Sequence, residues 1–192
     1  MSSRKIPILT VGAPLLIFVV VLIIGMLQSG GGSGQPGVND TLGEVDVTSD
    51  VYSDFQITTL DGRELRLSDL RGSIVMIDFW SSWCPPCRAE ASVLAEAYER
   101  WSELGVEFVG VSIWDNEEDV VDFVNRHNIV YPNGIDEDGS IAVEFGVKGI
   151  PEKFFVNPRG EIVRKINGPN TSQSLDAVLT QMSDEAIGIG GN

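Results

Sequence analysis

Residues 80–90 read Trp-Ser-Ser-Trp-Cys-Pro-Pro-Cys-Arg-Ala-Glu, and this stretch holds both cysteines of the chain, Cys84 and Cys87. Residues 73–80 lead into the pair and are apolar apart from Ser73 and Asp78, which is typical of a central parallel strand. From Pro86 onward, apolar residues recur at helical spacing. The cysteine pair is therefore expected where a buried strand meets the helix that follows it.

The rest of the pattern predicts a mixed sheet with helices on its faces. Two alternating runs, residues 55–60 and 63–67, flank Asp61 and Gly62, as in a β-hairpin. The helix after the cysteines is expected to bury four residues: Val93, Ala97, Trp101 and Leu104. The remaining expected elements are a strand at 106–113, a helix at 115–127, an extended piece at 130–132, a short helix at 140–145, strands at 153–156 and 161–166, and a last helix that buries Leu175, Val178, Leu179 and Met182.

The chain is strongly acidic, with a formal net charge of −15 over 192 residues. Nucleic-acid binding requires clustered lysine and arginine against phosphate, so no nucleic-acid partner is expected. Arg4 and Lys5 are the only charged residues before Gln28, and every acidic residue follows. The larger part of the chain is therefore expected to be soluble and to be repelled by anionic lipid headgroups.

Residues 6–27 carry no charge and are almost entirely apolar. At about 1.5 Å per residue, a helix of this length spans a bilayer core of roughly 30 Å. Arg4 and Lys5 precede the segment, and the next basic residue is Arg63. The positive-inside rule then predicts a single-pass protein of the cell membrane with a cytoplasmic N-terminus and an extracytoplasmic domain. A cleaved signal peptide is the alternative, although the exit of the segment lacks a clear cleavage site.

Three regions follow from this division of the chain. Residues 1–28 form the N-terminus and the transmembrane anchor, residues 29–50 a flexible linker, and residues 51–192 the folded domain. The linker begins with Ser-Gly-Gly-Gly-Ser-Gly-Gln-Pro-Gly and continues as a polar, acidic run, neither of which can bury a core.

A Cys-x-x-C spacing is compatible with zinc binding, a structural disulfide or redox catalysis. Zinc is disfavoured because a structural site needs four ligands, and the chain has no second cysteine pair and only one histidine, His127. A stabilising disulfide is disfavoured because closing so short a loop contributes only about 2 kcal/mol, against nearly 5 for a loop of roughly 100 residues. Redox catalysis suits the position best, since a helix N-terminus stabilises a thiolate.

In that reading Cys84 attacks a client disulfide, and Cys87 resolves the mixed disulfide. The two prolines between them favour the helical φ but have no N–H to offer the sulfur. The expected donors to the Cys84 sulfur are the N–H groups of Cys87 and Arg88. We therefore expect the pKa of Cys84 to lie below the usual value of about 8.5, without an extreme depression.

The sequence resembles the membrane-anchored, extracytoplasmic branch of the thioredoxin fold, the TlpA-like, ResA-like and CcmG-like thiol-disulfide oxidoreductases. The resemblance runs from residue 54 to residue 182 and rests on two motifs, Asp-Phe-Trp-x-x-Trp-Cys-Pro-Pro-Cys-Arg-x-Glu at 78–90 and Phe-Gly-Val-x-Gly-Ile-Pro-Glu-x-Phe at 145–154. It implies a thioredoxin-like α/β fold, with a central mixed sheet flanked by helices and an N-terminal β-hairpin extension. It also implies that the chain needs no cofactor beyond the redox-active disulfide Cys84–Cys87.

The resemblance also implies roles for residues outside the cysteine pair. Pro151 would be a cis-proline opposite the pair, leaving the Ile150 backbone open to pair with an extended substrate. Asp78 would be a buried acid beneath Cys87 that takes its proton. Glu152 is typical of the CcmG-like pattern and would lie near the active site at the substrate-binding surface, where Trp83 would belong to a partner-facing patch.

The resulting hypothesis is an extracytoplasmic reductant of protein disulfides, with apocytochrome c as the expected client in cytochrome c maturation. The resemblance implies a membrane electron donor of the CcdA or DsbD type. Two alternatives stay open, a general disulfide reductase or oxidase of other envelope proteins and a non-enzymatic copper metallochaperone. Against the metallochaperone, Sco-like proteins use a wider cysteine spacing together with a distant histidine, and His127 is badly placed for that role.

Overall fold

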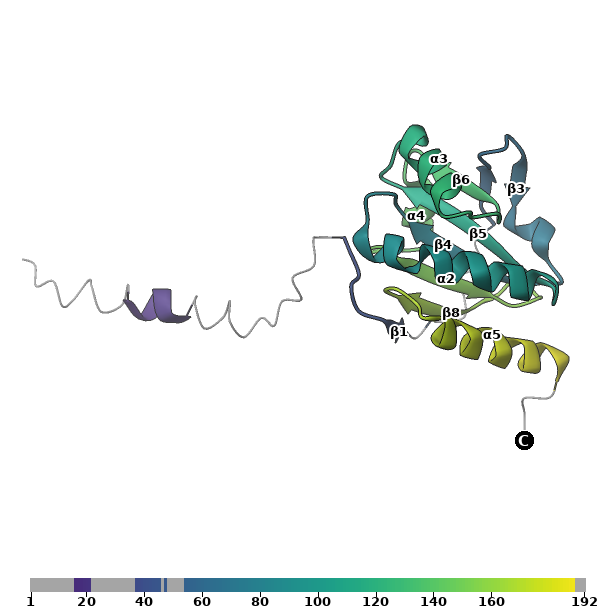
Figure 1. Ribbon diagram of the computed structural model, residues 1–192. Helices are drawn as coiled ribbons and strands as arrows, with labels where there is room; N and C mark the ends of the chain where they lie inside the picture. Colours follow the sequence, from purple (N-terminus) through teal and green to yellow (C-terminus); the bar gives the residue numbers. More distant parts are fainter. Residues whose placement is uncertain (1–15, 22–36, 46, 48–53, 189–192) are drawn as a thin grey trace, which may run out of the picture. The chain divides into compact units, whose positions relative to one another are not determined.

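The computed structural model describes residues 16–21, 37–45, 47 and 54–188 (Figure 1). Residues 16–21 are helical and belong to a separate unit from the folded domain. Most of the predicted membrane segment, residues 6–27, lies outside the described residues. Within the described part of the chain, no helix has both the length and the apolar character that crossing a bilayer requires.

The folded domain is built on a six-stranded mixed sheet with the order β1-β8-β7-β4-β5-β6. Its central strand, β4 (Ile74–Trp80), runs parallel to β5 (Val106–Ile113) and antiparallel to β7 (Glu152–Val156). The outer strands are β6 (Asn133–Asp136), β8 (Ile162–Asn167) and β1 (Gly43–Val45). All seven residues of β4 are buried, as the apolar pattern predicted.

The helices occupy the positions that the sequence indicated. They are α2 (Pro85–Ser102), α3 (Glu117–Arg126), α4 (Ser140–Glu144) and α5 (Ser172–Ile187). Helix α2 packs against β5 and α5. The predicted hairpin is present as β2 (Gln56–Thr58) and β3 (Glu64–Arg66), followed by the 3-10 helix η1 (Leu67–Leu70). These elements confirm a mixed α/β sheet with helices on its faces.

Three local expectations were wrong. Strand β6 begins at Asn133, just after the extended piece expected at 130–132. Its sequence, Asn-Gly-Ile-Asp, is too polar to predict a strand, and the strand forms because it pairs with β5. Leu104 is 70% exposed because α2 ends at Ser102, before the predicted apolar face reaches it. In the same helix Leu94 is buried and Val93 is only half-buried.

The folded domain also begins earlier than residue 51. β1, which lies within the predicted linker of residues 29–50, pairs antiparallel with β8, from Gly43 opposite Asn167 to Val45 opposite Lys165. Without β1, the backbone of β8 would present an open sheet edge, so an adjoining polar segment gains hydrogen bonds by pairing there. The composition of residues 29–50 predicted a flexible linker, because composition carries no information about the free edge of β8.

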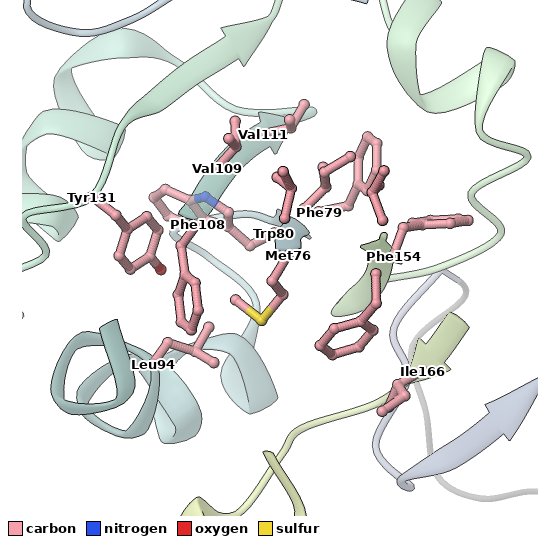
Figure 2. Packing of buried hydrophobic residues seen from close by; sticks show 14 of the residues in the cluster. Met76, Phe79, Trp80, Leu94, Phe108, Val109, Val111, Tyr131, Phe154 and Ile166 are labelled. Carbon is pink, nitrogen blue, oxygen red and sulfur yellow. The ribbon is translucent and has the colours of Figure 1, made fainter. Parts of the chain in front are cut away.

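The core lies on both faces of β4 (Figure 2). Phe79 contacts an aromatic group made of Phe145 and Phe154, with ring centroids 5.3 and 5.6 Å away. Trp80 stacks on Phe123 at 4.5 Å and donates its indole N–H to Asn133 Oδ1 at 3.0 Å. This packing fixes the carboxyl end of β4, from which the cysteine loop departs.

Gly110 in β5 provides a test of this packing. A Cβ at Gly110 would lie 1.8 Å from Asn133 Oδ1 and 3.0 Å from Trp80 Nε1, so Gly110→Ala must displace the Asn133 side chain. Overpacking of this kind costs about 2 kcal/mol. We expect urea unfolding to show that loss for Gly110→Ala and almost none for Gly43→Ala, where no atom lies within 4 Å of the added Cβ. Equal stability of the two variants would contradict the packing described here.

Candidate active site

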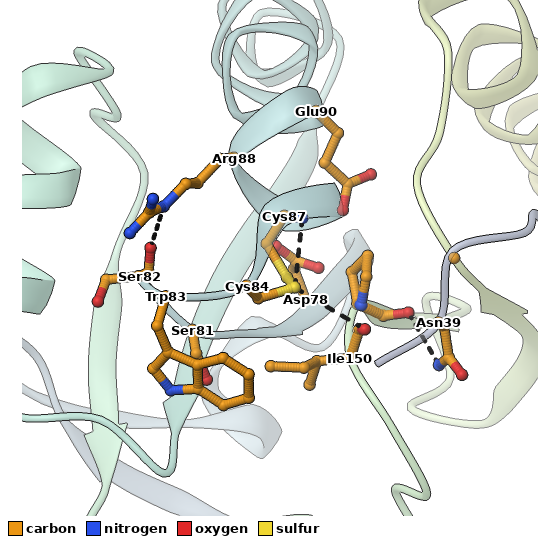
Figure 3. Close-up of a disulfide and its surroundings, with 12 residues drawn as sticks. Asn39, Asp78, Ser81, Ser82, Trp83, Cys84, Cys87, Arg88, Glu90 and Ile150 are labelled. Atoms are coloured by element: carbon orange, nitrogen blue, oxygen red, sulfur yellow. Dashed lines mark hydrogen bonds between the residues drawn. A yellow bond between two sulfur atoms is a disulfide. The ribbon is translucent and has the colours of Figure 1, made fainter. Parts of the chain in front are cut away.

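Cys84 and Cys87 form a disulfide at the N-terminus of α2 (Figure 3). Cys84 is the N-cap residue of the helix, and its sulfur accepts the N–H of Cys87 at 3.3 Å. The N–H of Arg88 instead donates to the Cys84 carbonyl oxygen at 3.1 Å. Only one of the two expected donors therefore reaches the sulfur, which supports a modest stabilisation of the Cys84 thiolate.

The surroundings of the disulfide are tightly packed. Cys84 is fully buried and Cys87 is 3% exposed. Trp83, just before the pair, is 37% exposed and donates its indole N–H to the Trp114 carbonyl at 2.9 Å. The exposure of Trp83 suits a partner-facing residue, whereas Trp80 is in the core as expected. Contact between Trp83 and a client stays a prediction.

The loop opposite the disulfide carries the expected cis-proline. The Ile150–Pro151 peptide bond is cis, and the Ile150 carbonyl oxygen lies 3.8 Å from Cys84 Sγ. The expectation of an open Ile150 backbone is wrong for this structure. The Ile150 N–H donates to the Gly37 carbonyl at 2.8 Å, and the Ile150 carbonyl accepts the Asn39 N–H at 2.6 Å. Residues from the predicted linker already hold both groups.

Asp78 lies beneath the disulfide, as the resemblance implied (Figure 3). Its side chain is buried and lines a small cavity together with Cys87. Burial raises the pKa of Asp78, an effect that the nearby Lys153 ammonium partly offsets. A raised pKa makes the Asp78 carboxylate a stronger base, so it can accept a proton from the neighbouring Cys87.

Two further charged groups, which the sequence did not single out, lie in this interior. Lys153 on β7 lies opposite Asp78 in the strand register, and its Nζ is 3.8 Å from Asp78 Oδ1. The same Nζ donates to Glu90 Oε1 on α2, and Asn170 N–H donates to Glu90 Oε2 at 2.7 Å. Lys153 and Glu90 are both buried. The available signal was a charged pair, Glu152 and Lys153, directly before the apolar residues 154–156, and it is weaker than the apolar context on both sides that singled out Asp78.

The buried group contains two carboxyls and one ammonium, so full ionisation would leave an uncompensated negative charge. Burial raises the pKa of Glu90 to about 7, with Lys153 acting in the opposite direction. Glu90 accepts two hydrogen bonds that favour its charged form, whereas Asp78 Oδ1 has no hydrogen-bond donor among the described residues. Asp78 is therefore the more basic of the two carboxyls, and its ionised form is the one that can accept a proton from Cys87.

Glu152 was expected at the substrate-binding surface, but the structure places it in the interior. The side chain is fully buried, and Oε1 accepts the N–H groups of Lys148 and Gly149 at 3.1 and 3.2 Å. Its other oxygen lies 2.6 Å from Lys165 Nζ. A strand-start acid is buried here because the loop before Pro151 supplies backbone donors and β8 supplies a cation. Glu152 therefore braces that loop from within.

Asp78→Asn tests proton transfer at Cys87. The amide cannot accept the Cys87 proton, so resolution of a mixed disulfide on Cys84 should slow by about 100-fold, within the range typical of general acid–base catalysis. Stopped-flow kinetics with a model disulfide separates this step from the initial attack by Cys84. The initial attack serves as the internal control and should change little. A normal rate of resolution would remove the role of Asp78.

Glu90→Gln tests the buried carboxyl through stability. The pKa of Glu90 rises from 4.5 to about 7 on folding, so between these pH values the folded state binds more protons than the unfolded chain. The Glu90 contribution therefore makes the free energy of unfolding fall as the pH rises from about 4.5 to about 7. We expect urea unfolding to show a weaker fall over this window in Glu90→Gln. Identical pH profiles for the two proteins would contradict the raised pKa.

Comparison with known proteins agrees with this site. The AhpC/TSA family model matches residues 48–165. The chain is 30% identical over 129 residues to the thiol-disulfide oxidoreductase ResA of Bacillus thuringiensis subsp. konkukian, covering 67% of this chain and 75% of that protein. Two solved structures are similar. One is MTB DsbF, with a TM-score of 0.64 and 32% identity over 70% of this chain and 99% of that chain. The other is StoA from Bacillus subtilis, with a TM-score of 0.60 and 28% identity over 68% and 98%.

The residues that the family model matches include the disulfide, the buried acid and the cis-proline loop. The sheet order, the helix that begins at Cys84 and the cis bond at Pro151 are the arrangement that the sequence motifs implied. The chain therefore belongs to the AhpC/TSA family and, within it, to the thioredoxin-fold thiol-disulfide oxidoreductases similar to ResA.

Proposed function

We propose that this thiol-disulfide oxidoreductase works outside the cytoplasm, tethered to the cell membrane, as a reductant of protein disulfides. The observation that carries the proposal is the position of Cys84 as N-cap of α2, with its sulfur on the N–H of Cys87 and Asp78 in the cavity beside Cys87. This arrangement supplies an attacking thiolate, a resolving thiol and a proton acceptor. The apolar run at 6–27 and the basic residues before it support the tether and its orientation.

The exchange proceeds in two balanced steps. In the reduced protein, the Cys84 thiolate attacks one sulfur of the client disulfide, forming a mixed disulfide and releasing the other client sulfur as a thiolate. Cys87 then gives its proton to Asp78 and attacks Cys84 Sγ, which closes the Cys84–Cys87 disulfide and releases the second client thiolate. Two electrons pass to the client, and a membrane donor of the CcdA or DsbD type restores the dithiol.

The proposed clients are apocytochrome c cysteines. Support comes from the resemblance to ResA-like and CcmG-like chains and from the acid directly after the cis-proline, Glu152. Glu152 is buried and would affect the selection of clients indirectly. Its carboxylate accepts the N–H groups of Lys148 and Gly149 in the loop that faces the disulfide. General reduction of other envelope proteins is the alternative within the same chemistry.

Reduction of insulin by dithiothreitol distinguishes an oxidoreductase from a copper metallochaperone. We expect the domain to accelerate insulin precipitation and Cys84→Ser to abolish the effect, since Cys84 is the attacking sulfur. Titration of the reduced protein with Cu(I) should give no tight complex that depends on His127. His127 is the C-cap residue of α3, and its ring packs at a tilt against Phe123, with ring centroids 4.5 Å apart. Tight, His127-dependent copper binding without insulin reduction would favour the metallochaperone.

A Cys87→Ser variant expressed in the native membrane tests the client. Without the resolving sulfur, clients should remain covalently attached to Cys84 and be released by reductant. We expect the captured proteins to contain Cys-x-x-Cys-His haem-attachment motifs. The double variant Cys84→Ser/Cys87→Ser is the control and should capture none of them. Capture of unrelated envelope proteins would instead identify a general reductase.

A further inference from the structure

Residues 37–42, here called the strap, lie along the cis-proline loop that faces the disulfide (Figure 3). Val38 forms a parallel bridge with Ile150. Gly37 accepts the Ile150 N–H at 2.8 Å, and Asn39 donates its N–H to the Ile150 carbonyl at 2.6 Å. The strap therefore uses the backbone donor and acceptor that adjoin Pro151 on the side of Cys84.

Side chains also hold the strap in place. Asn39 Nδ2 donates to the Pro151 carbonyl at 3.3 Å and lies 3.5 Å from Glu152 Oε1. Val38 is partly buried against the core. The same Glu152 oxygen accepts the loop N–H groups of Lys148 and Gly149, so the strap and the loop share one buried carboxylate.

Two glycines give the strap room to approach. A Cβ at Gly149 would lie 3.1 Å from the Gly37 carbonyl oxygen. A Cβ at Gly168, whose φ is +82°, would lie 2.2 Å from the Thr41 carbonyl oxygen. Any side chain at Gly168 would therefore exclude the strap from this path. The close contacts at Gly149 and Gly168 show that the domain surface is shaped to bind an extended segment.

This binding surface matters because a client must pair with the same backbone edge at Ile150. An extended peptide that adds to a strand edge takes its affinity from main-chain hydrogen bonds, and the Ile150 N–H can serve only one acceptor at a time. The strap's backbone and a client backbone therefore exclude each other at Ile150. Cys84 is fully buried while the strap is in place, so a client sulfur also needs a rearrangement to reach it.

We propose that residues 37–42 are an internal competitor for the client-binding edge, and that a client must displace this strap from Ile150 before it exchanges with Cys84. The proposal rests on the thiol-disulfide exchange described above. It identifies the client as a peptide segment in extended conformation, since the strap that it replaces is held by backbone pairing. It also gives the segment before β1 a function in selecting which disulfides reach Cys84.

Two variants of the full chain separate the backbone bond from the side chain. Asn39→Pro removes the N–H that donates to Ile150 as well as the amide side chain, whereas Asn39→Ala removes the side chain alone. We expect reduced Asn39→Pro to attack a short disulfide-bonded peptide about fivefold faster than the parent, the factor for one net hydrogen bond. Asn39→Ala removes only the longer side-chain contacts, at 3.3 and 3.5 Å, and should accelerate the attack less than Asn39→Pro does. Equal rates in the two variants, or a slower Asn39→Pro, would overturn the proposal.

A measurement on the unaltered strap guards against misfolding of Asn39→Pro. A mixed disulfide between Cys87→Ser protein and a cysteine-containing peptide fixes the client-bound state, and amide hydrogen exchange then reports on each backbone bond. We expect the Asn39 amide to lose protection while the Ile150 amide stays protected by the client. Retained protection of Asn39 would overturn the strap's displacement. Absence of any mixed disulfide would instead count against exchange at Cys84 itself.

Discussion

The burial of β4 on both of its faces is the constraint on which the rest of this structure depends. Every residue of the strand is inside, including Asp78, and the strand ends where the cysteine loop begins. A carboxyl group in such a position cannot be solvated, so it must either hold its proton or find a cation. Lys153 on the neighbouring strand is that cation, and it is also bound by Glu90 from α2. The strand that organises the hydrophobic core, β4, therefore also carries the carboxyl group that can exchange protons, Asp78.

The same strand sets how the two sulfurs differ. Cys84 caps α2 and receives one backbone N–H, because the prolines at the first helical positions contribute none. Cys87 lies one turn into the helix and lines the cavity that Asp78 also lines. In the proposed exchange, the helix end therefore favours the thiolate of Cys84, the attacking sulfur, and a carboxyl lies within reach of Cys87, the resolving sulfur. The helix N-terminus would thus promote the attack by Cys84, and Asp78 would promote the resolution by Cys87.

The cis-proline loop couples this chemistry to the segment before β1. Glu152 holds the loop from inside through two backbone N–H groups, while Gly37 and Asn39 hold it from outside through Ile150. Both contacts act on the backbone next to Cys84. Changes in the segment before β1 can thus reach the active site without touching either cysteine.

The sequence alone determined the fold, because apolar periodicity records which residues must leave water and the motif at 78–90 records where strand meets helix. It likewise determined the cysteine pair, and the family resemblance carried by the motifs at 78–90 and 145–154 implied the buried acid Asp78 and the cis-proline at 151. Only the tertiary structure decided the partners of those residues. The pairing of Asp78 with Lys153 depends on the register between β4 and β7, and the capture of Ile150 by Gly37 and Asn39 depends on an edge that composition cannot show. Local pattern reports burial, whereas which buried or edge groups meet is set by strand order, register and shape.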